Sequence, residues 1–196
     1  MQHGTLKESN VQKTVKPKRS RLTPDARVAQ LLETAISLFA QKGLGRVGHG
    51  DIAKAANVST GTVFNYFPTI DGLNAAVMDA VSETTLSIFV DEIAADQSAV
   101  LVYGHRILAL VEDNPNLLKI FLNWSNAFSE PYRGAFLTLK GEIIFHITQS
   151  LSEREQADID AKILFGTGVL LAQMKIEGTS EEDLNSFAAR VAQLVG

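Results

Sequence analysis

The amino-acid sequence predicts an all-α protein of about nine helices. Three observations lead to this prediction. Apolar residues recur every three or four positions along most of the 196-residue chain, which is the spacing of an amphipathic helix. Residues that favour helix ends, above all Ser, Thr, Pro and Gly, stand where these segments begin and end. The sequence shows neither the two-residue alternation and Asn-Gly turns of a β-sheet nor an internal repeat.

The composition narrows the classes of protein to which the chain can belong. Hydrophobic residues make up 45% of the sequence, which is enough for a folded core. Cysteine is absent, so disulfides and cysteine-bound metals are excluded, and the four histidines are scattered. A glycine-rich phosphate loop and the Gly-x-Ser-x-Gly motif of hydrolases are also missing. We therefore expect no enzyme activity, no metal site and no cofactor.

Charge is distributed unevenly along the chain. Residues 1–71 carry ten Lys and Arg against five Asp and Glu, whereas residues 72–196 carry eight against seventeen. Such asymmetry indicates that the basic end meets a polyanion, although a solvated basic tail would give the same pattern. Residues 1–22 are polar and show no helical pattern, so we predict a flexible basic arm there.

The segments that would direct the chain into or across a membrane are missing from the sequence. The N-terminal segment has no apolar stretch of the kind found in secretory signals. No uninterrupted apolar run reaches the ~18–20 residues that a membrane-spanning helix needs. We therefore expect a cytoplasmic protein with no membrane partner.

The first predicted helix follows the basic arm. Thr23 suits the N-cap position, and Pro24 suits the first position of the helix. Apolar residues then recur at helical spacing as far as Gly43. Glycine at that place favours a left-handed helix end, so we predict a helix from Pro24 to about residue 42.

Two short helices are predicted next. The first covers Asp51–Ala56, and the second is capped by Ser59 and runs to about Tyr66. Asn57 lies at the turn between them, where a left-handed backbone is tolerated. Pro68 ends the second helix because the residue before a proline disfavours helical geometry.

The spacing of three residues in this pair is typical of a helix-turn-helix. Ala53 is small enough for two helices to cross, Asn57 follows four positions later at the turn, and Val63 lies six further on to pack the helices together. In such a pair the second helix can enter the major groove of DNA. We therefore predict a DNA-binding domain over residues 23–69.

The remaining predicted helices form a second domain over residues 70–196. Their starts and ends follow from caps, prolines and the apolar spacing. They are expected from Thr69 to about Ala94, from Asp96 or Ser98 to Asn114, over 116–128, from Tyr132 to Leu151, over 153–177 behind the cap Ser152, and over 180–195.

Several motifs resemble those of a known family. "DIAKAANVSTGTVFNYFPTIDGL" is similar to the DNA-binding signature of the TetR family. "GRVGHGDIA", "FNYFPT" and "FLNWS" resemble, more narrowly, the LuxR/HapR/SmcR subfamily of quorum-sensing master regulators. The resemblance implies a TetR-like fold, with three helices for DNA and six for dimerisation and ligand binding. It also implies a homodimer on a pseudo-palindromic site in double-stranded DNA, and hence association with the bacterial nucleoid.

Candidate DNA contacts lie on the arm and on the second short helix. Asn65 has the paired donor and acceptor that can read a base edge, and the resemblance implies this contact; the alternative is a surface residue without a partner. The resemblance also places the two arm arginines in the minor groove, against the alternative of a diffuse electrostatic tail. Phe64 and Phe67 are expected in the core. The full set of candidates is Arg19, Arg21, His49, Ser59, Thr60, Gly61, Thr62, Asn65 and Tyr66, of which His49 suits a phosphate contact or a structural cap equally.

The second domain holds two further candidate sites. An apolar pocket for a small ligand is predicted from a dense set of apolar residues: Ile88, Phe89, Leu110, Phe121, Trp124, Phe128 and Phe136. A dimer interface is predicted along the eighth helix at Ile159, Ile163, Gly166, Leu170 and Met174. Each set could instead be ordinary core.

The sequence leads to one functional hypothesis and two alternatives. The first is a homodimeric, sequence-specific transcription regulator of the quorum-sensing master-regulator type. The second is a TetR-type local repressor that a small apolar metabolite or drug releases from DNA. The third is an all-α enzyme or scaffold, which the absence of catalytic motifs disfavours.

Overall fold

The computed structural model describes residues 22–43, 45–91, 93, 98–130, 132–151 and 153–195. Within these ranges the chain forms nine α-helices and one 3-10 helix, so the all-α prediction is confirmed. None of the helices described is long and apolar enough to cross a membrane. Residues 1–21 of the predicted arm, with Arg19 and Arg21, and the predicted cap Ser152 lie outside the described residues.

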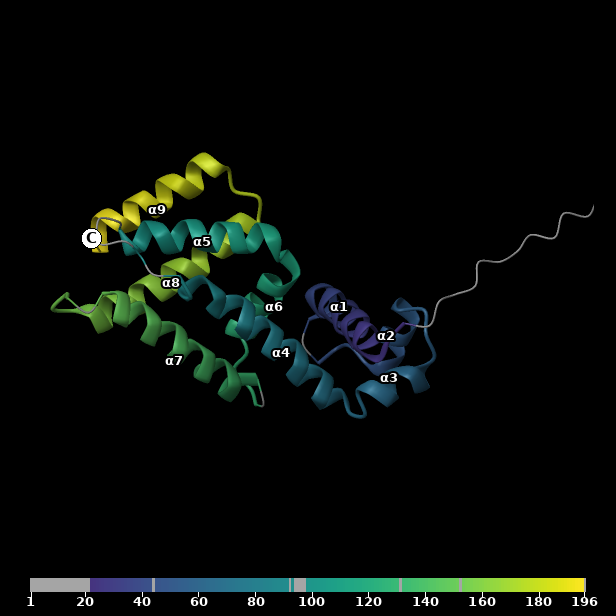
Figure 1. The fold of residues 1–196 in the computed structure, drawn as a ribbon. Coiled ribbons are helices and arrows are strands. Elements are labelled where there is room, and N and C mark those ends of the chain that lie inside the picture. The colour runs from purple at the N-terminus through teal and green to yellow at the C-terminus, as the bar shows by residue number, and fades with distance from the viewer. Residues whose placement is uncertain are drawn as a thin grey trace, which may run out of the picture.

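Three helices form a group at one end of the molecule (Figure 1). The hydroxyl of Thr23 accepts a hydrogen bond from the Ala26 amide at 3.3 Å and so caps the first of them. This helix ends at Gly43, whose φ of 86° is readily available only to glycine. The group consists of α1 (Pro24–Lys42), α2 (His49–Ala55) and α3 (Thr60–Tyr66).

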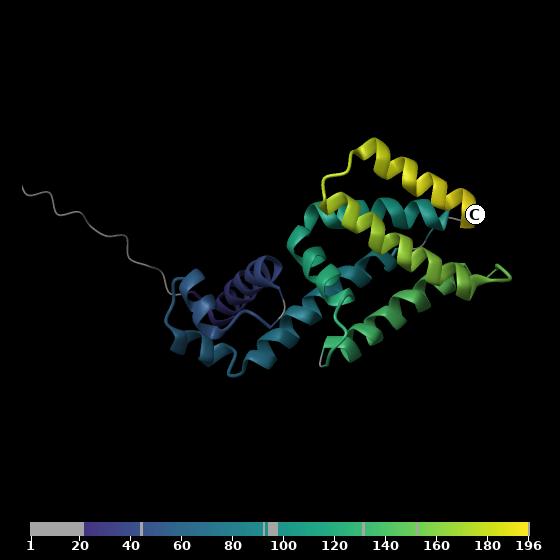
Figure 2. The same ribbon diagram turned by 180° about the vertical axis from the view of Figure 1, so that it is seen from behind.

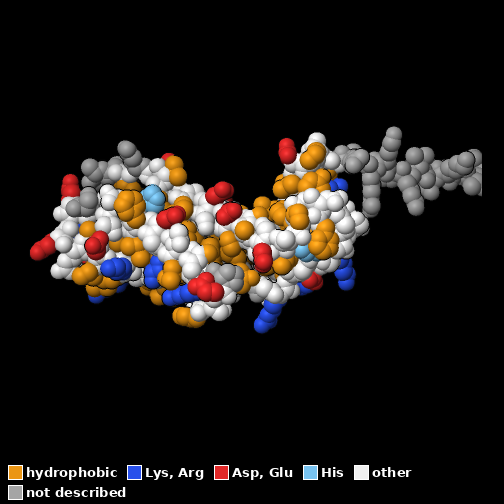
Figure 3. All heavy atoms as spheres, turned by 90° about the horizontal axis from the view of Figure 1, so that it is seen from below, with side chains coloured by type: hydrophobic (Ala, Val, Ile, Leu, Met, Phe, Trp, Pro, Cys, Tyr) orange, Lys and Arg blue, Asp and Glu red, His pale blue; other side chains and the backbone are white. Residues whose placement is uncertain are grey.

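Helix α4 (Ile70–Leu86) runs from the end of α3 to the second group of helices (Figure 1). Its buried side chains Leu73, Val77 and Val81 belong to the same hydrophobic core as those of α1 and α6. Both α1 and α4 pack against α6. A continuous core therefore joins the two groups, although a notch separates them on the surface (Figure 3). The boundary at residues 69 and 70 stays a prediction.

The second group contains the remaining helices (Figure 2). Helices α5, α8 and α9 pack against one another at the end far from α3, and α7 lies along α8. The elements are η1 (Ser87–Phe89), α5 (Ala99–Asp113), α6 (Pro115–Ser125), α7 (Tyr132–Ser150), α8 (Ala157–Ile176) and α9 (Glu181–Val195).

The largest differences from the predicted helix boundaries are at the end of α4 and the start of α8. Helix α4 was expected to reach Ala94, but it ends at Leu86 and gives way to a 3-10 turn. There the Arg106 side chain of α5 donates to the carbonyl oxygens of Ile88 and Asp91, at 2.7 and 3.0 Å. The guanidinium thus supplies the hydrogen bonds that backbone amides would give these carbonyl oxygens in a continuing α-helix. Helix α8 begins at Ala157 rather than near residue 153, after a series of turns.

Candidate functional site

Helices α2 and α3 form the predicted helix-turn-helix. Asn57 has a φ of 53°, so it occupies the left-handed region expected at the turn. The Val58 amide donates to the Ala53 carbonyl oxygen at 3.0 Å and closes the turn. Ile52, Ala53 and Val63 are buried where the two helices cross. The residues that define the spacing therefore fix the angle between the helices.

The start of α2 is tied to the end of α1 by one carboxylate. Asp51 accepts a hydrogen bond from the Gly48 amide at 3.0 Å and pairs with the Lys42 ammonium at 2.6 Å. The hydrogen bond from Lys42 is the main reason that the pKa of Asp51 is lowered, followed by the bond from Gly48. This early helix start, at His49 rather than Asp51, was not predicted from the sequence.

Replacing Asp51 with asparagine should make the stability of the protein less dependent on acid pH. A carboxyl whose pKa is lower in the folded state stabilises the fold above its unfolded pKa, and this contribution is lost as the pH falls through the folded value. Thermal unfolding of the native protein and Asp51→Asn between neutral pH and about pH 3 would measure this. We expect the difference in melting temperature to be largest near neutral pH and to shrink on acidification. A constant difference would contradict this role of the carboxylate.

The outer face of α3 is small and polar. The Ser59 hydroxyl accepts the Thr62 amide at 3.1 Å, which confirms the predicted cap at the start of the helix. Gly61 and Asn65 lie one turn apart on the side opposite the buried Val63, and both are exposed. Thr60 is also exposed, whereas Thr62 and Tyr66 are half-buried at the flanks. The structure therefore brings the candidates of this helix together on one surface.

Phe64 does not belong to the core, so the sequence-based expectation for this residue is wrong. Its side chain is 48% exposed, and its ring stacks on that of His49 with centroids 4.1 Å apart. Phe67 is buried, as expected. His49 also donates through Nε2 to the Phe67 carbonyl oxygen at 2.8 Å. No local sequence pattern indicates this contact, because it joins residues 18 positions apart.

Two basic residues near the helix pair are not among the candidates predicted from the sequence. Lys54 lies on α2 and is exposed, as is Arg46 in the segment before α2. Neither forms an ion pair within the described ranges, whereas Lys42 pairs with Asp51. The excess of basic residues in the first 71 positions could have pointed to Lys54 and Arg46 as candidate phosphate contacts.

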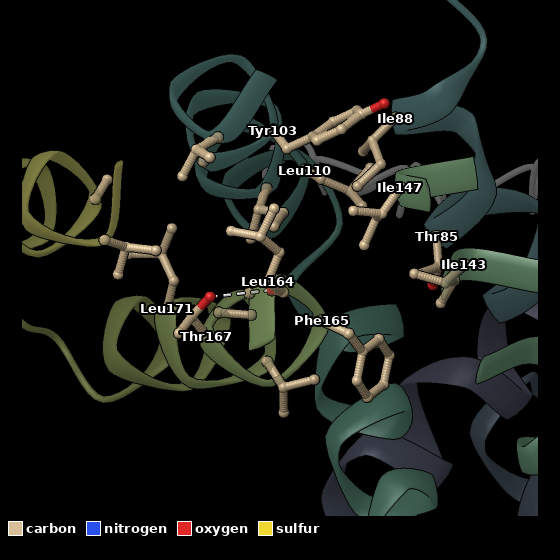
Figure 4. Close-up of a pocket in the computed structure, with 18 of the residues that line it drawn as sticks. Thr85, Ile88, Tyr103, Leu110, Ile143, Ile147, Leu164, Phe165, Thr167 and Leu171 are labelled. Atoms are coloured by element: carbon tan, nitrogen blue, oxygen red, sulfur yellow. Dashed lines mark hydrogen bonds between the residues drawn. The ribbon is translucent and has the colours of Figure 1, made fainter. Parts of the chain in front are cut away.

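A cavity of about 80 Å³ lies inside the second group of helices (Figure 4). Helices α5, α8 and α9 contribute most of the residues that line it, and nearly all of these are apolar. Of the residues predicted for a pocket, four line the cavity: Ile88, Phe89, Leu110 and Phe121.

The three hydroxyl groups around the cavity already have partners. Thr85 donates to the Val81 carbonyl oxygen at 2.7 Å, and Thr167 donates to that of Leu164 at 3.1 Å. The Tyr103 hydroxyl bonds to that of Ser150. The space therefore offers apolar contact and no unpaired hydroxyl, which favours a dry cavity.

The other three predicted pocket residues lie outside the cavity lining. Trp124 is buried and donates through its indole N–H to the Tyr132 carbonyl oxygen at 2.7 Å, with its ring edge against Phe136. Phe128 is 80% exposed, with the Arg133 guanidinium 5.1 Å above its ring. The prediction was wrong for Phe128 because α6 ends at Ser125, and the following segment turns Phe128 away from the bundle. The indole N–H of Trp124 is bound to a backbone carbonyl and does not face the cavity.

The residues predicted for a dimer interface share one face of α8. Ile159, Ile163 and Leu170 are 53%, 46% and 45% exposed, and Gly166 between them is also exposed. Met174 differs, because it is half-buried against a small core cluster that residues of α5, α8 and α9 form. Four of the five residues thus form an exposed apolar stripe, here called the α8 stripe.

The chain is similar to known transcription regulators in sequence and in structure. The family model described as bacterial regulatory proteins, tetR family, matches residues 31–77, from the middle of α1 into α4. Over 123 residues the chain is 37% identical to the HTH-type transcriptional regulator LuxR of Vibrio harveyi. That match covers 61% of this chain and 60% of LuxR, so the chain matches less than two thirds of that relative's length.

Solved structures share the fold over nearly the whole chain. GusR of Salmonella enterica superposes with a TM-score of 0.72 at 18% identity, covering 89% of this chain and 95% of GusR. A TetR-like transcriptional regulator from Rhodococcus gives a TM-score of 0.74 at 18% identity, covering 89% and 96%. The helix-turn-helix geometry and the family model agree over residues 31–77, which match the tetR family of bacterial regulatory proteins, and the described helices share the fold of a solved TetR-like regulator.

Proposed function

We propose that the protein is a homodimeric, sequence-specific DNA-binding regulator of transcription. The outer face of α3 carries this proposal. Gly61 and Asn65 point away from the buried Val63, and a methyl group added at Gly61 would meet nothing closer than 3.8 Å. Packing within the chain therefore does not demand glycine there. A glycine that leaves the helix backbone accessible suits close approach by DNA.

The amide of Asn65 gives the proposed surface its specificity. Its side chain forms no hydrogen bond within the described part of the molecule, and it can accept and donate at once to an adenine edge. Exposed Lys54 and Arg46, together with the basic residues before residue 22, would supply contacts to phosphates. The identity to LuxR supports the quorum-sensing master-regulator type.

Mapping of bound sites across the genome, followed by gel shifts on a recovered site, tests the proposal. Many bound sites are expected of a master regulator, and one or two of a local repressor. The logarithm of affinity should fall steeply with the logarithm of salt concentration, because bound phosphates release counterions. A flat salt dependence and no preference for any mapped site would refute DNA binding.

A dimer would place two copies of α3 on the two halves of a palindromic site. The α8 stripe supports this assembly, because it exposes three large apolar side chains on one helix face. Gly166 in the middle of the stripe meets no neighbouring atom within 4 Å of an added Cβ, so it leaves room for a close partner. We infer that the stripe packs against its equivalent in a second copy.

A local repressor released by a small apolar ligand is the second candidate function, and the cavity favours it. Its volume of about 80 Å³ is below the ~150 Å³ that accommodates benzene in a known engineered cavity. A ligand would therefore have to move the surrounding helices. A ligand that fits only the conformation with moved helices would favour that conformation over the DNA-binding one. Such a difference in affinity for the two conformations is what release from DNA requires.

Replacing Gly168 with alanine should reduce the binding of an apolar probe. An added Cβ at this position would lie 3.0 Å from Cδ1 of Ile107, so that side chain must shift at the cavity wall. Benzene at ten times its dissociation constant should stabilise the native protein by about 1.4 kcal/mol. We expect a smaller rise in melting temperature for Gly168→Ala, measured by calorimetry with and without benzene.

Gly141→Ala on α7 is the matched control for this experiment. A Cβ added at Gly141 meets nothing within 4 Å. The free energy of unfolding of this variant should still rise by the advantage of alanine over glycine in a helix, roughly 0.5–1 kcal/mol. It should respond to benzene as the native protein does. Equal responses of all three proteins would place the binding elsewhere, and no response from the native protein would remove the support for a ligand.

A further inference from the structure

The short helix α3 packs on the core through few side chains. It has seven residues, and Val63 is its only buried side chain. Its first turn is anchored by the Ser59 cap and by the turn at Asn57. Its last turn packs through half-buried Tyr66 and through buried Phe67, which ends the helix. Apolar packing is not directional, so a hydrogen bond at this end fixes the tilt of the helix further.

His49 provides that contact from the first position of α2. Its Nε2 lies 2.8 Å from the carbonyl oxygen of Phe67, the residue that ends α3. A carbonyl oxygen only accepts, so Nε2 carries the proton in this bond. The next residue, Pro68, has no amide hydrogen and cannot continue the helix. The bond therefore joins the two ends of the helix pair that lie opposite the turn.

The Phe64 ring completes this arrangement. It stacks on His49 with an angle of 12° between the ring planes and a centroid distance of 4.1 Å. The stacked ring covers one face of the imidazole and restricts its rotation. This accounts for a phenylalanine that remains 48% exposed on α3.

We propose that His49 is a positioning residue that holds the last turn of α3, and with it Asn65, at the angle needed to read a base. Asn65 lies two residues before Phe67, in the turn that the His49 bond fixes. A bidentate contact to a base edge needs both the distance and the orientation of the amide. This inference rests on the proposed DNA binding and assigns His49 no direct contact with DNA.

Affinities of variants for a mapped operator and for unrelated DNA test the proposal. His49→Ala should weaken operator binding about fivefold to tenfold, the effect of one hydrogen bond, and leave binding to unrelated DNA nearly unchanged. His49→Gln should recover much of this loss, because its amide can still donate to the carbonyl. An equal loss on both DNAs would indicate a phosphate contact and overturn the proposal. Unchanged operator binding, or no recovery in His49→Gln, would overturn it too.

Two measurements without DNA separate this inference from the function on which it rests. Nitrogen-15 NMR of the free protein should show the His49 proton on Nε2. Hydrogen exchange of the Phe67 amide, which donates to Val63, should accelerate in His49→Ala, while that of Thr62 at the capped end stays unchanged. A proton on the other nitrogen, or unchanged exchange at Phe67, would overturn the proposal even if DNA binding is confirmed. If the native protein binds no DNA specifically, these two results still decide whether His49 holds the helix.

Discussion

Replacing Ile163 with glutamate is expected to convert the protein to a monomer and to weaken operator binding by roughly 100-fold or more. Ile163 lies in the middle of the α8 stripe and is half-exposed in the single chain. In a two-fold interface each copy contributes the same patch, so one substitution introduces two carboxylates. Burying them without partners opposes association. A monomer then binds one half-site and loses the gain in effective concentration from the second.

Sedimentation velocity would measure the oligomeric state, and titration of the operator would measure the affinity. Phe145→Glu on α7 is the matched control, because Phe145 is 59% exposed but lies on another helix. We expect this control to remain a dimer and to bind the operator normally. A dimeric Ile163→Glu, or a monomeric Phe145→Glu, would place the interface away from the α8 stripe.

Asn65→Ala is expected to weaken operator binding by about 1–3 kcal/mol, a factor of about 5 to 160, with little effect on unrelated DNA. The exposed amide of Asn65 is the group on α3 best suited to read a base in two places at once. Its removal takes away base discrimination without changing the charge of the surface. Competition titrations with an operator and with scrambled DNA would measure both affinities.

Lys54→Ala is the contrasting variant on the neighbouring helix. Lys54 is exposed, and its ammonium suits a phosphate contact. Its loss should weaken binding to all sequences by a similar factor and reduce the salt slope by about one. If Asn65→Ala also weakened binding to all sequences equally, Asn65 would contact the DNA phosphates and not the bases.

The helices could be predicted because their signals are local. Thr23, Ser59 and Gly43 stand at helix ends for reasons of backbone geometry that the sequence displays directly. The helix-turn-helix was predictable for the same reason, since its turn depends on Asn57 and its crossing on residues close in sequence. The early end of α4 was not, because it depends on Arg106 of another helix.

The sequence by itself determined the order of the helices, the helix-turn-helix and the polar residues offered on α3, because caps, spacing and turns act over a few residues. Only the tertiary structure decided which aromatic residues line the cavity, that Phe64 stacks on His49, and that His49 reaches the end of α3. These outcomes depend on contacts between residues far apart in the chain. The direction of a side chain on an amphipathic helix is set by the neighbour that it meets, and that neighbour is known only once the helices have packed.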